Sequence, residues 1–222
     1  VIPGPVSYLL LGKEKEKGFD RLDLIDRLLP VYFQIFQQLR EAGADWIQLD
    51  EPFLNLDLTD KQRAVYQQVY RKIRDQFPSL KILLATYFEG LHDNTDLAVN
   101  LPVDALHLDL VRAPGQIEEV LDKSPEGQIL SRGLVEGRNV WKNNFDKSLK
   151  YIQKARKVKD LDHLMISASS SLLHVPYDLD LEKDEKNLPA EIKNWMAFAR
   201  QKLHELTTLS LLADPQTRHE AK

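Results

Sequence analysis

The sequence predicts an α/β fold: an incomplete (β/α)8 barrel of the TIM type, with about six βα units. Apolar strands alternate with amphipathic helices along the 222 residues. This alternation is typical of parallel strands joined by right-handed crossovers. Polar side chains follow successive strands, and a barrel gathers such side chains at one mouth. An open doubly wound sheet also fits the alternation, but no glycine-rich phosphate motif follows any strand, which weakens its dinucleotide-binding version.

Composition narrows the possible partners of the chain. A net charge of −4 gives no electrostatic reason to expect nucleic acid or an acidic membrane surface. No apolar run approaches the roughly 18 residues of a membrane-spanning helix. The chain has no cysteine, so it forms no disulfide and no thiolate metal site of its own. It begins at Val1 inside an apolar segment, which suggests a fragment or a processed chain.

The first 43 residues predict a strand and a long helix. Residues 1–11 are expected to form a strand running into a loop, in which two prolines allow only short pairing. Residues 12–18 form a lysine-rich loop, which is solvated or, as the lesser alternative, holds an anionic group. Asp20 is placed to cap a helix that Gly43 ends. Pro30 interrupts that helix, so we expect a kink or two abutting helices.

The next βα unit carries the clearest local signals. Trp46–Asp50 suits a buried strand, and Pro52 lacks the N–H that a continuing ladder needs. Thr59 with Gln62 predicts a capping box at the start of a helix that stops near Pro78.

The remaining units follow the same alternation. Strands are expected at residues 80–87, 103–109, 128–135 and 163–168, and shorter helices at 93–99, 116–121 and 146–158. A last helix is expected to have one apolar face, made of Ile192, Trp195, Met196, Ala199, Leu203 and Leu206. We expect residues 1–212 to form the partial barrel and residues 213–222 a polar, frayed tail.

The candidate binding residues all follow strands, where ligands bind in parallel α/β folds. An aspartate there pairs with an ammonium group, whereas an arginine forks onto a carboxylate, so an amino acid or another carboxylated ligand suits the set. The candidates are Asp50, Glu51, Tyr87, His107, Asp109, Arg112, Arg138, Asn139 and His174.

Several candidates also have a purely structural interpretation, and His174 can simply be a loop histidine with ordinary structural hydrogen bonds. Asp50 at a strand end can simply cap the next turn. His107 and Asp109 are two residues apart, so they face the same side of a strand and can bond to each other without a ligand. Arg138 and Asn139 can order their own loop. Ser171 near His174 admits a hydrolytic triad, but no Gly-x-Ser-x-Gly nucleophile elbow is present.

Several motifs, taken in order along nearly the whole chain, resemble the family of cobalamin-independent methionine synthases. These motifs are Gly4–Leu9 with Gly12 and Lys13, Leu28–Tyr32, Trp46–Pro52, Thr86–Phe88, Leu106–Val111, Gly137–Trp141, Ser169–His174 and residues 195–205.

The resemblance implies a fold and a reaction. The family has two facing β/α barrels, and this chain resembles the later part of the N-terminal one. The family's Arg-Glu-Leu-Lys stretch, which contacts folate, and its C-terminal barrel have no counterpart here. That C-terminal barrel holds the zinc ligands, the homocysteine contacts and the catalytic histidine. No catalytic or metal residue of the family therefore carries over to this sequence, and Asp50 resembles the counterpart of a homocysteine-binding aspartate in a barrel that has lost that role.

These observations set the functional expectations. The chain is expected to be a cytoplasmic fragment of a zinc-dependent methyltransferase of methionine biosynthesis, which moves a methyl group from 5-methyltetrahydropteroyltriglutamate to homocysteine. The fragment supplies scaffold and a folate-side wall, holds no cofactor, and is inactive without the missing parts of its parent chain. Two alternatives stay open: a stand-alone barrel enzyme of the decarboxylase or corrinoid-linked methyltransferase type, and a non-enzymatic assembly module with unpaired strand edges.

Overall fold

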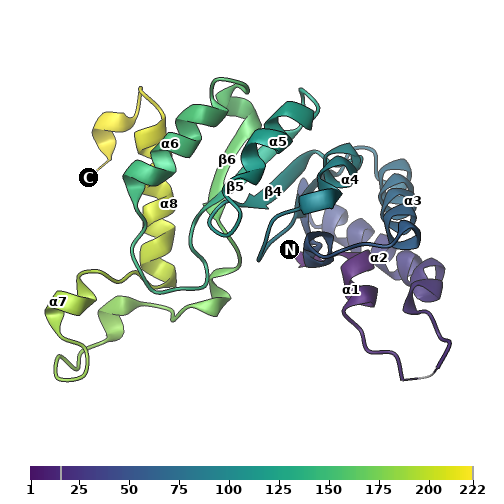
Figure 1. The fold of residues 1–222 in the computed structure, drawn as a ribbon, viewed down its shortest axis with the longest axis horizontal. Coiled ribbons are helices and arrows are strands. Elements are labelled where there is room, and N and C mark those ends of the chain that lie inside the picture. Colours follow the sequence, from purple (N-terminus) through teal and green to yellow (C-terminus); the bar gives the residue numbers. More distant parts are fainter. Residues whose placement is uncertain (16, 222) are drawn as a thin grey trace. The chain divides into compact units, whose positions relative to one another are not determined.

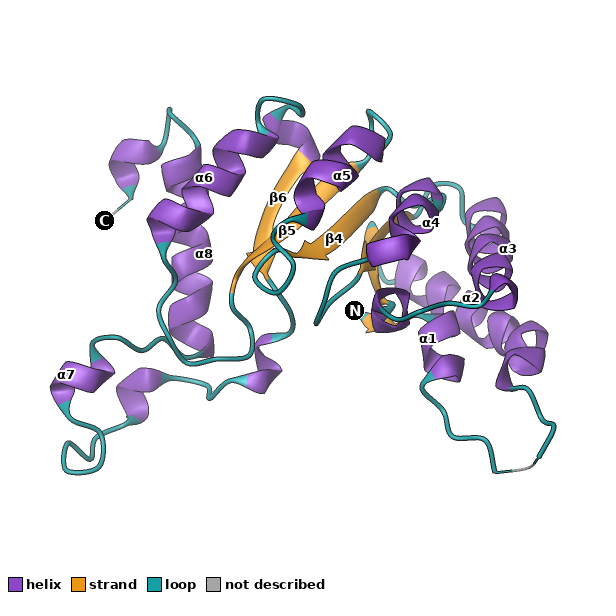
Figure 2. Cartoon of the chain, viewed as in Figure 1, coloured by secondary structure: helices purple, strands orange, loops and turns teal. Residues whose placement is uncertain are grey.

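The computed structural model describes residues 1–15 and 17–221, and it divides into two compact units. Unit 1 comprises Val1–Leu108 with Gly115–Leu130, and unit 2 comprises Asp109–Pro114 with Ser131–Lys222. Among the described residues, six strands alternate with helices (Figures 1 and 2), which confirms the predicted α/β class. Glu16 of the predicted lysine loop and Lys222 of the predicted tail lie outside the described residues.

Unit 1 contains a parallel sheet whose strands follow chain order. These strands are β1 (Ile2–Pro3), β2 (Trp46–Asp50), β3 (Lys81–Ala85) and β4 (Ala105–Asp109), the last of which ends where unit 2 begins. Its helices are α1 (Pro5–Leu10), α2 (Ile25–Glu41), α3 (Asp60–Gln76), α4 (Thr95–Asn100) and α5 (Gln116–Lys123).

The two faces of β2 differ in burial, as the period of a strand requires. Ile47 and Leu49 are buried, whereas Gln48 and Asp50 are half-buried. Ile47 and Leu49 belong to a buried hydrophobic core that also contains Phe36 of α2 and Ile73 of α3. Gln48 and Asp50 therefore face away from this packing layer, which leaves their polar groups available at the opposite face of the sheet.

Three local predictions are confirmed in unit 1. Thr59 accepts from the backbone N–H of Gln62, and the Gln62 side chain accepts from Thr59 N at 2.8 Å, so the capping box is complete. Gly43 has φ of 90°, the left-handed geometry that lets a glycine end a helix. The Asp20 side chain accepts from Leu22 N at 2.9 Å, although it starts a short 3-10 turn rather than α2 itself.

Two predictions for the N-terminal half are wrong. Residues 5–10 form helix α1 rather than an extended segment, because Pro5 occupies the first helical position, where its fixed φ favours a helix and its missing N–H costs nothing. Helix α2 runs unbroken through Pro30, so the two abutting helices expected at that residue are wrong, and the junction of two helical segments falls at Leu24–Ile25 instead. A kink at Pro30 within α2 stays a prediction.

Unit 2 contains the later strands and helices. Strand β5 (Ile129–Val135) begins at the end of unit 1, and β6 (Leu164–Ala168) lies next to it in the sheet. The helices are α6 (Phe145–Ala155), the short α7 (Ala190–Lys193) and α8 (Ala199–Ala213). In Figure 1, α6 and α8 lie side by side, in agreement with their direct packing.

The predicted last helix is wrong in both its length and its face. The chain breaks between α7 and α8, because Met196 forms an antiparallel bridge with Trp141. Trp195 and Leu203 are exposed, whereas α8 buries Lys202, Glu205 and Leu209. The helical pattern assigned the apolar residues to the core, but unit 2 instead places two charged residues there.

The C-terminal segment continues past α8 into an ordered turn. Arg156 Nη1 donates to the carbonyl of Ala213 at 2.7 Å, and a 3-10 turn follows at Arg218–Glu220. Across the described residues, no helix is both long and apolar enough to cross a membrane.

Candidate functional site

Asp50 lies at the C-terminal end of β2 and is held by two neighbours. Tyr87 Oη donates to Asp50 Oδ2 at 2.6 Å, and Gln48 Nε2 donates to Asp50 Oδ1 at 2.7 Å. Burial, followed by the hydrogen bond to Asp50, raises the pKa of the Tyr87 hydroxyl, so this hydroxyl stays protonated as a donor. The carboxylate is thus oriented, half-buried and at the strand edge where ligands bind.

The strand register places Asp50 and His107 in one row. Asp50 pairs with Ala85 in the neighbouring strand, and Ala85 pairs with His107 in the next. Two strand spacings separate the Cα atoms of Asp50 and His107 by about 10 Å. Ala85 stands between them in the register, so the row holds an acidic side chain and a buried imidazole side chain on either side of a small residue.

The exit of β3 is strained next to this row. Phe88 has φ of 82°, a value that a bulky side chain rarely adopts. The rings of Tyr87 and Phe88 meet edge to face with centroids 4.8 Å apart. Strained backbone of this kind concentrates at functional sites, where the surroundings hold it in place. The strain therefore supports a site around Tyr87 and Asp50.

Glu51 points into the core of unit 1 and is fully buried. Its carboxylate accepts from Val6 N at 3.3 Å, Ser7 N at 2.7 Å, Tyr66 Oη at 3.1 Å and Tyr70 Oη at 3.0 Å. Burial raises the pKa of Glu51, while the donors from Ser7, Tyr70 and Val6 lower it. Four donors from the chain itself occupy the carboxylate, which makes Glu51 an anchor for α1 and α3.

Three of the predicted residues of unit 2, Asp109, Arg112 and Arg138, lie at the exits of β4 and β5. Asp109 Oδ1 accepts from Val111 N at 3.1 Å and from Arg112 N at 2.9 Å, and burial raises its pKa. The guanidinium of Arg112 lies 4.0 Å from Glu136. Glu136 also accepts from Arg138 N at 3.0 Å. Glu136 therefore links two arginines that the sequence placed on separate loops.

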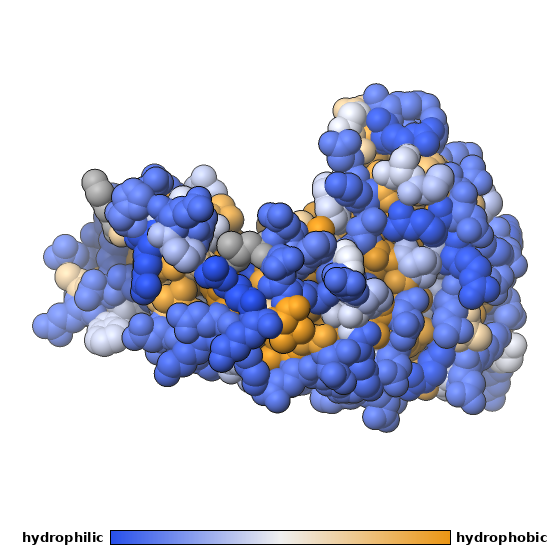
Figure 3. Space-filling model, turned by 90° about the horizontal axis from the view of Figure 1, so that it is seen from above, coloured by the Kyte–Doolittle hydropathy of each residue, from blue (hydrophilic) through white to orange (hydrophobic). Residues whose placement is uncertain are grey.

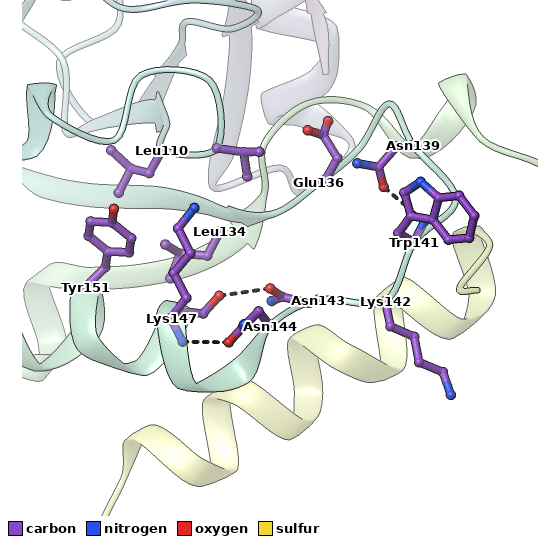
Figure 4. A pocket seen from close by; sticks show the side chains of 12 residues that line it. Leu110, Leu134, Glu136, Asn139, Trp141, Lys142, Asn143, Asn144, Lys147 and Tyr151 are labelled. Carbon is purple, nitrogen blue, oxygen red and sulfur yellow. Dashed lines mark hydrogen bonds between the residues drawn. The ribbon is translucent and has the colours of Figure 1, made fainter. Parts of the chain in front are cut away.

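Asn139 lines a cavity of about 150 Å³ within unit 2. Figure 4 shows Glu136 and Asn139 at one end of this cavity and Lys147 and Tyr151 of α6 at the other. Asn139 Oδ1 accepts from Trp141 N at 3.0 Å, and Asn144 Oδ1 caps α6 by accepting from Lys147 N at 2.9 Å. The lining combines apolar residues, such as Leu110 and Leu134, with polar residues and with charged residues of both signs. His174 lies apart, exposed on the 3-10 turn Leu172–His174.

Sequence reasoning missed four polar residues that position these groups: Gln48, Glu136, and the pair Lys202 and Glu205. Lys202 Nζ donates to the carbonyl of Trp141 and Glu205 Oε1 accepts from Asn143 N, both at the lining of the cavity. Gln48 orients Asp50, and its place two residues earlier on the same strand was a usable signal. Glu136 directly follows β5, so its position carried the same signal as the chosen candidates. Lys202 and Glu205 gave no such signal, because charged residues on a helix normally face solvent.

The described residues do not fit the zinc site that the family resemblance implies. No group of three His, Cys, Asp or Glu side chains comes together among them in a way that holds a metal ion. The whole sequence also lacks cysteine.

Comparison with known proteins identifies relatives along almost the whole chain. A 5-methyltetrahydropteroyltriglutamate–homocysteine methyltransferase of Cytophaga hutchinsonii is 55% identical over 96% of this chain, and that of Flavobacterium johnsoniae is 52% identical over 96%. The chain spans 28% of the length of each of these relatives.

Solved structures show the same fold. A putative vitamin-B12-independent methionine synthase from Listeria monocytogenes matches with a TM-score of 0.62 and 16% identity, over 95% of this chain and 61% of that one. This likeness agrees with the predicted incomplete barrel. A family model described as the N-terminal domain of cobalamin-independent synthase matches residues 1–160. The chain therefore belongs to the cobalamin-independent synthase family and represents part of its N-terminal domain.

Proposed function

We propose that this chain is part of a methyltransferase that transfers a methyl group from 5-methyltetrahydropteroyltriglutamate to homocysteine. The identity of 55% to a relative bearing that name, over 96% of the chain, carries the proposal. The chain covers 28% of that relative, so the reaction belongs to a longer polypeptide. A zinc site with thiolate ligands lies, in this proposal, in the C-terminal barrel outside this chain, and the enzyme works in the cytoplasm.

Within that enzyme, unit 1 supplies a wall of the substrate site. Asp50, fixed by Gln48 and Tyr87, presents an oriented carboxylate in the same row as His107. In unit 2, considered by itself, Arg112 and Arg138 bring positive charge to the loops that follow β4 and β5. This charge suits the carboxylates of a polyglutamate tail, because guanidinium groups bind carboxylates in a two-pronged geometry.

The first experiment is to read the coding DNA on both sides of Val1 and Lys222 and to assay methyl transfer by the two forms. We expect an upstream half-barrel with Arg-Glu-Leu-Lys and a downstream barrel with His-x-Cys and a later Cys. The longer polypeptide should then convert homocysteine to methionine, and the 222-residue chain should not. Turnover by the cleanly purified chain alone, or no turnover by the longer polypeptide, contradicts the proposal.

A substitution tests the wall itself. In the longer polypeptide, Asp50→Ala should raise KM for a substrate about 10-fold and leave kcat nearly unchanged, because a wall residue contributes uniform binding. Asp75→Ala, at an exposed position of α3, is the matched control. If the two variants have the same KM and kcat, Asp50 is not part of the substrate site.

A further inference from the structure

The loop that follows β3 in unit 1 is fastened at both of its ends. Thr86 donates twice to the carbonyl of His107, from its backbone N at 3.3 Å and from Oγ1 at 2.8 Å. At the other end, Asn94 Nδ2 donates to the carbonyl of Leu56 at 2.8 Å. Residues 87–93 therefore connect two fixed points, and their backbone has to adapt to the distance between them.

The chain makes this connection with a left-handed residue at Phe88. Its φ of 82° lies where a side chain crowds the backbone, so a phenylalanine there has a conformational cost that a glycine would avoid. Phe88 is only half-buried, and the surface in Figure 3 is mostly hydrophilic with a few apolar patches. Burial in the hydrophobic core therefore does not account for a large ring at this strained position.

The left-handed backbone brings two aromatic rings to one side of the chain. If the strand continued, Tyr87 and Phe88 would point to opposite faces, as consecutive strand residues do. Instead the chain turns at Phe88, and the two rings meet edge to face with centroids 4.8 Å apart and planes at 67°. This geometry is favourable for aromatic pairs, so the ring of Phe88 restricts the directions open to the ring of Tyr87.

The direction of the Tyr87 ring in turn decides where its hydroxyl lies. Tyr87 Oη donates to Asp50 Oδ2 at 2.6 Å, and Gln48 Nε2 donates to Asp50 Oδ1 at 2.7 Å. Because a carboxylate has about four lone pairs, these two donors leave about two lone pairs for a ligand, in directions that the donors set. A different direction of the Tyr87 ring would remove one donor and let the carboxylate rotate.

We propose, resting on the proposed function in which Asp50 belongs to the substrate site, that Phe88 is a positioning residue for Asp50. The ring of Phe88 holds Tyr87 Oη on Asp50, and Tyr87 then sets the direction in which Asp50 offers its remaining lone pairs to a substrate. Phe88 acts through Tyr87 and Asp50. Its removal should therefore weaken substrate binding less than the removal of Asp50 does, and should have no effect on binding once Asp50 is absent.

Nuclear magnetic resonance of the 222-residue chain with ¹³C-labelled tyrosine tests the contact without any assay of activity. The Cζ resonance of Tyr87 responds to the hydrogen bond of its hydroxyl. We expect Phe88→Gly to shift this resonance at least about 2-fold further in the wild-type chain than in Asp50→Ala, because only the wild-type chain has that hydrogen bond to lose. Equal shifts in the two backgrounds overturn the proposal, since they show only the loss of the neighbouring ring.

Two further variants control the same measurement. Phe88→Tyr keeps an aromatic ring and should leave the Tyr87 resonance at its wild-type position, whereas a shift as large as that of Phe88→Gly contradicts a role for the ring. Glycine tolerates the left-handed backbone, so circular dichroism should show that Phe88→Gly stays folded. If it does not, Phe88→Asn replaces it, because asparagine also adopts positive φ.

Kinetics of the longer polypeptide measure the effect on substrate binding. Phe88→Gly should raise KM for a substrate about 5-fold with kcat nearly unchanged, and should add nothing to the effect of Asp50→Ala in the double variant. Phe33→Ala is the matched control, because Phe33 makes an edge-to-face contact of the same kind with Phe77, at 5.7 Å, and should leave KM unchanged.

The outcomes separate the two proposals. A normal KM in Asp50→Ala removes Asp50 from the substrate site and, with it, the effect of Phe88 on a substrate, while the resonance of Tyr87 still decides whether Phe88 holds Tyr87 on Asp50. A raised KM in Asp50→Ala beside a normal KM in Phe88→Gly overturns the role of Phe88 alone. An equal rise of KM in Phe88→Gly and Phe33→Ala also overturns it, because any lost aromatic contact would then have the same effect.

Discussion

Both units bury charge, but they satisfy it differently. In unit 1, the Glu51 carboxylate receives four hydrogen bonds from α1 and α3. In unit 2, Arg132 of β5 is 1% exposed and donates from Nε to the carbonyl of Met165 at 3.2 Å, while its Nη1 has no hydrogen-bond partner. Burial lowers the pKa of Arg132 to about 10.

This difference separates two uses of a buried charge. A carboxylate with four donors joins distant segments, so its loss leaves several buried groups unpaired. A guanidinium with one bond keeps most of its desolvation cost, and replacing it removes that cost.

The three tryptophans report on the units separately: Trp46 lies in unit 1, and Trp141 and Trp195 lie in unit 2.

The largest effect is expected from Glu51→Ala. Removing the carboxylate leaves two backbone N–H groups and two tyrosine hydroxyls without their acceptor, which should lower the free energy of unfolding by about 3–5 kcal/mol. Urea unfolding followed at Trp46 measures the change. Glu14→Ala, at an exposed glutamate of the same unit, should change it by less than about 0.5 kcal/mol. Similar losses for both variants would show that Glu51 is no anchor.

Arg132→Met should act in the opposite direction. Methionine fills a similar volume without the unpaired guanidinium, so we expect the free energy of unfolding to rise by about 1–2 kcal/mol. The measurement is urea unfolding followed at the two tryptophans of unit 2. Arg218→Met, at an exposed position, is the control. A clear loss of stability in Arg132→Met would mean that this guanidinium is as well satisfied as Glu51.

Thr59→Ala measures how much an ordinary helix cap contributes to stability, for comparison with the buried charges of Glu51 and Arg132. Loss of the capping box should lower the stability of unit 1 by about 1 kcal/mol. Thr207→Ala within α8 has no cap to remove and should be neutral or slightly stabilising, because alanine favours a helix. Equal effects of the two substitutions would indicate that the capping box adds nothing beyond helix propensity.

The smallest effect is a change in the pH dependence of unit 2. The folded-state pKa of Lys202 lies below the ordinary value of 10.5, so the unfolded chain binds more protons between these two values. The contribution of Lys202 to the free energy of unfolding therefore rises as the pH increases from its folded-state pKa to its unfolded-state pKa. Lys202→Met should remove this rise, whereas Lys150→Met, at an exposed position of α6, should keep it. If the free energy of unfolding depends on pH in the same way in both variants, Lys202 does not carry the costly buried charge described above.

The sequence predicted elements whose causes are local. The strand Trp46–Asp50 and the Thr59 capping box depend on neighbouring residues, so composition and spacing were sufficient. The break before α8 was missed because its cause is the bridge from Met196 to Trp141, which are 55 positions apart. Helix α1 was missed because Pro5 was interpreted as a strand-breaker rather than as a first helical residue.

The candidate site was predictable in outline. Position at or after the end of a strand selected Asp50 and Tyr87 as candidates, whereas His107, which was expected to follow a strand, lies within β4. The register places Asp50 and His107 in one row. The same signal could not tell Asp50 from Glu51, because adjacent residues differ only in the face to which they point. Which face is the core depends on Tyr66 and Tyr70 of α3, and no local pattern contains that information.

Gly137 brings the exit loops of β5 and β6 together more closely than any side chain would allow. A Cβ atom at this position would lie 2.6 Å from both the carbonyl oxygen and the hydroxyl of Ser170. Gly137 N also donates to Ser169 Oγ at 3.1 Å. The loop that carries Arg138 and Trp141 therefore cannot shift toward its neighbour without collision, so the two loops are expected to open and close as one cooperative body in hydrogen exchange.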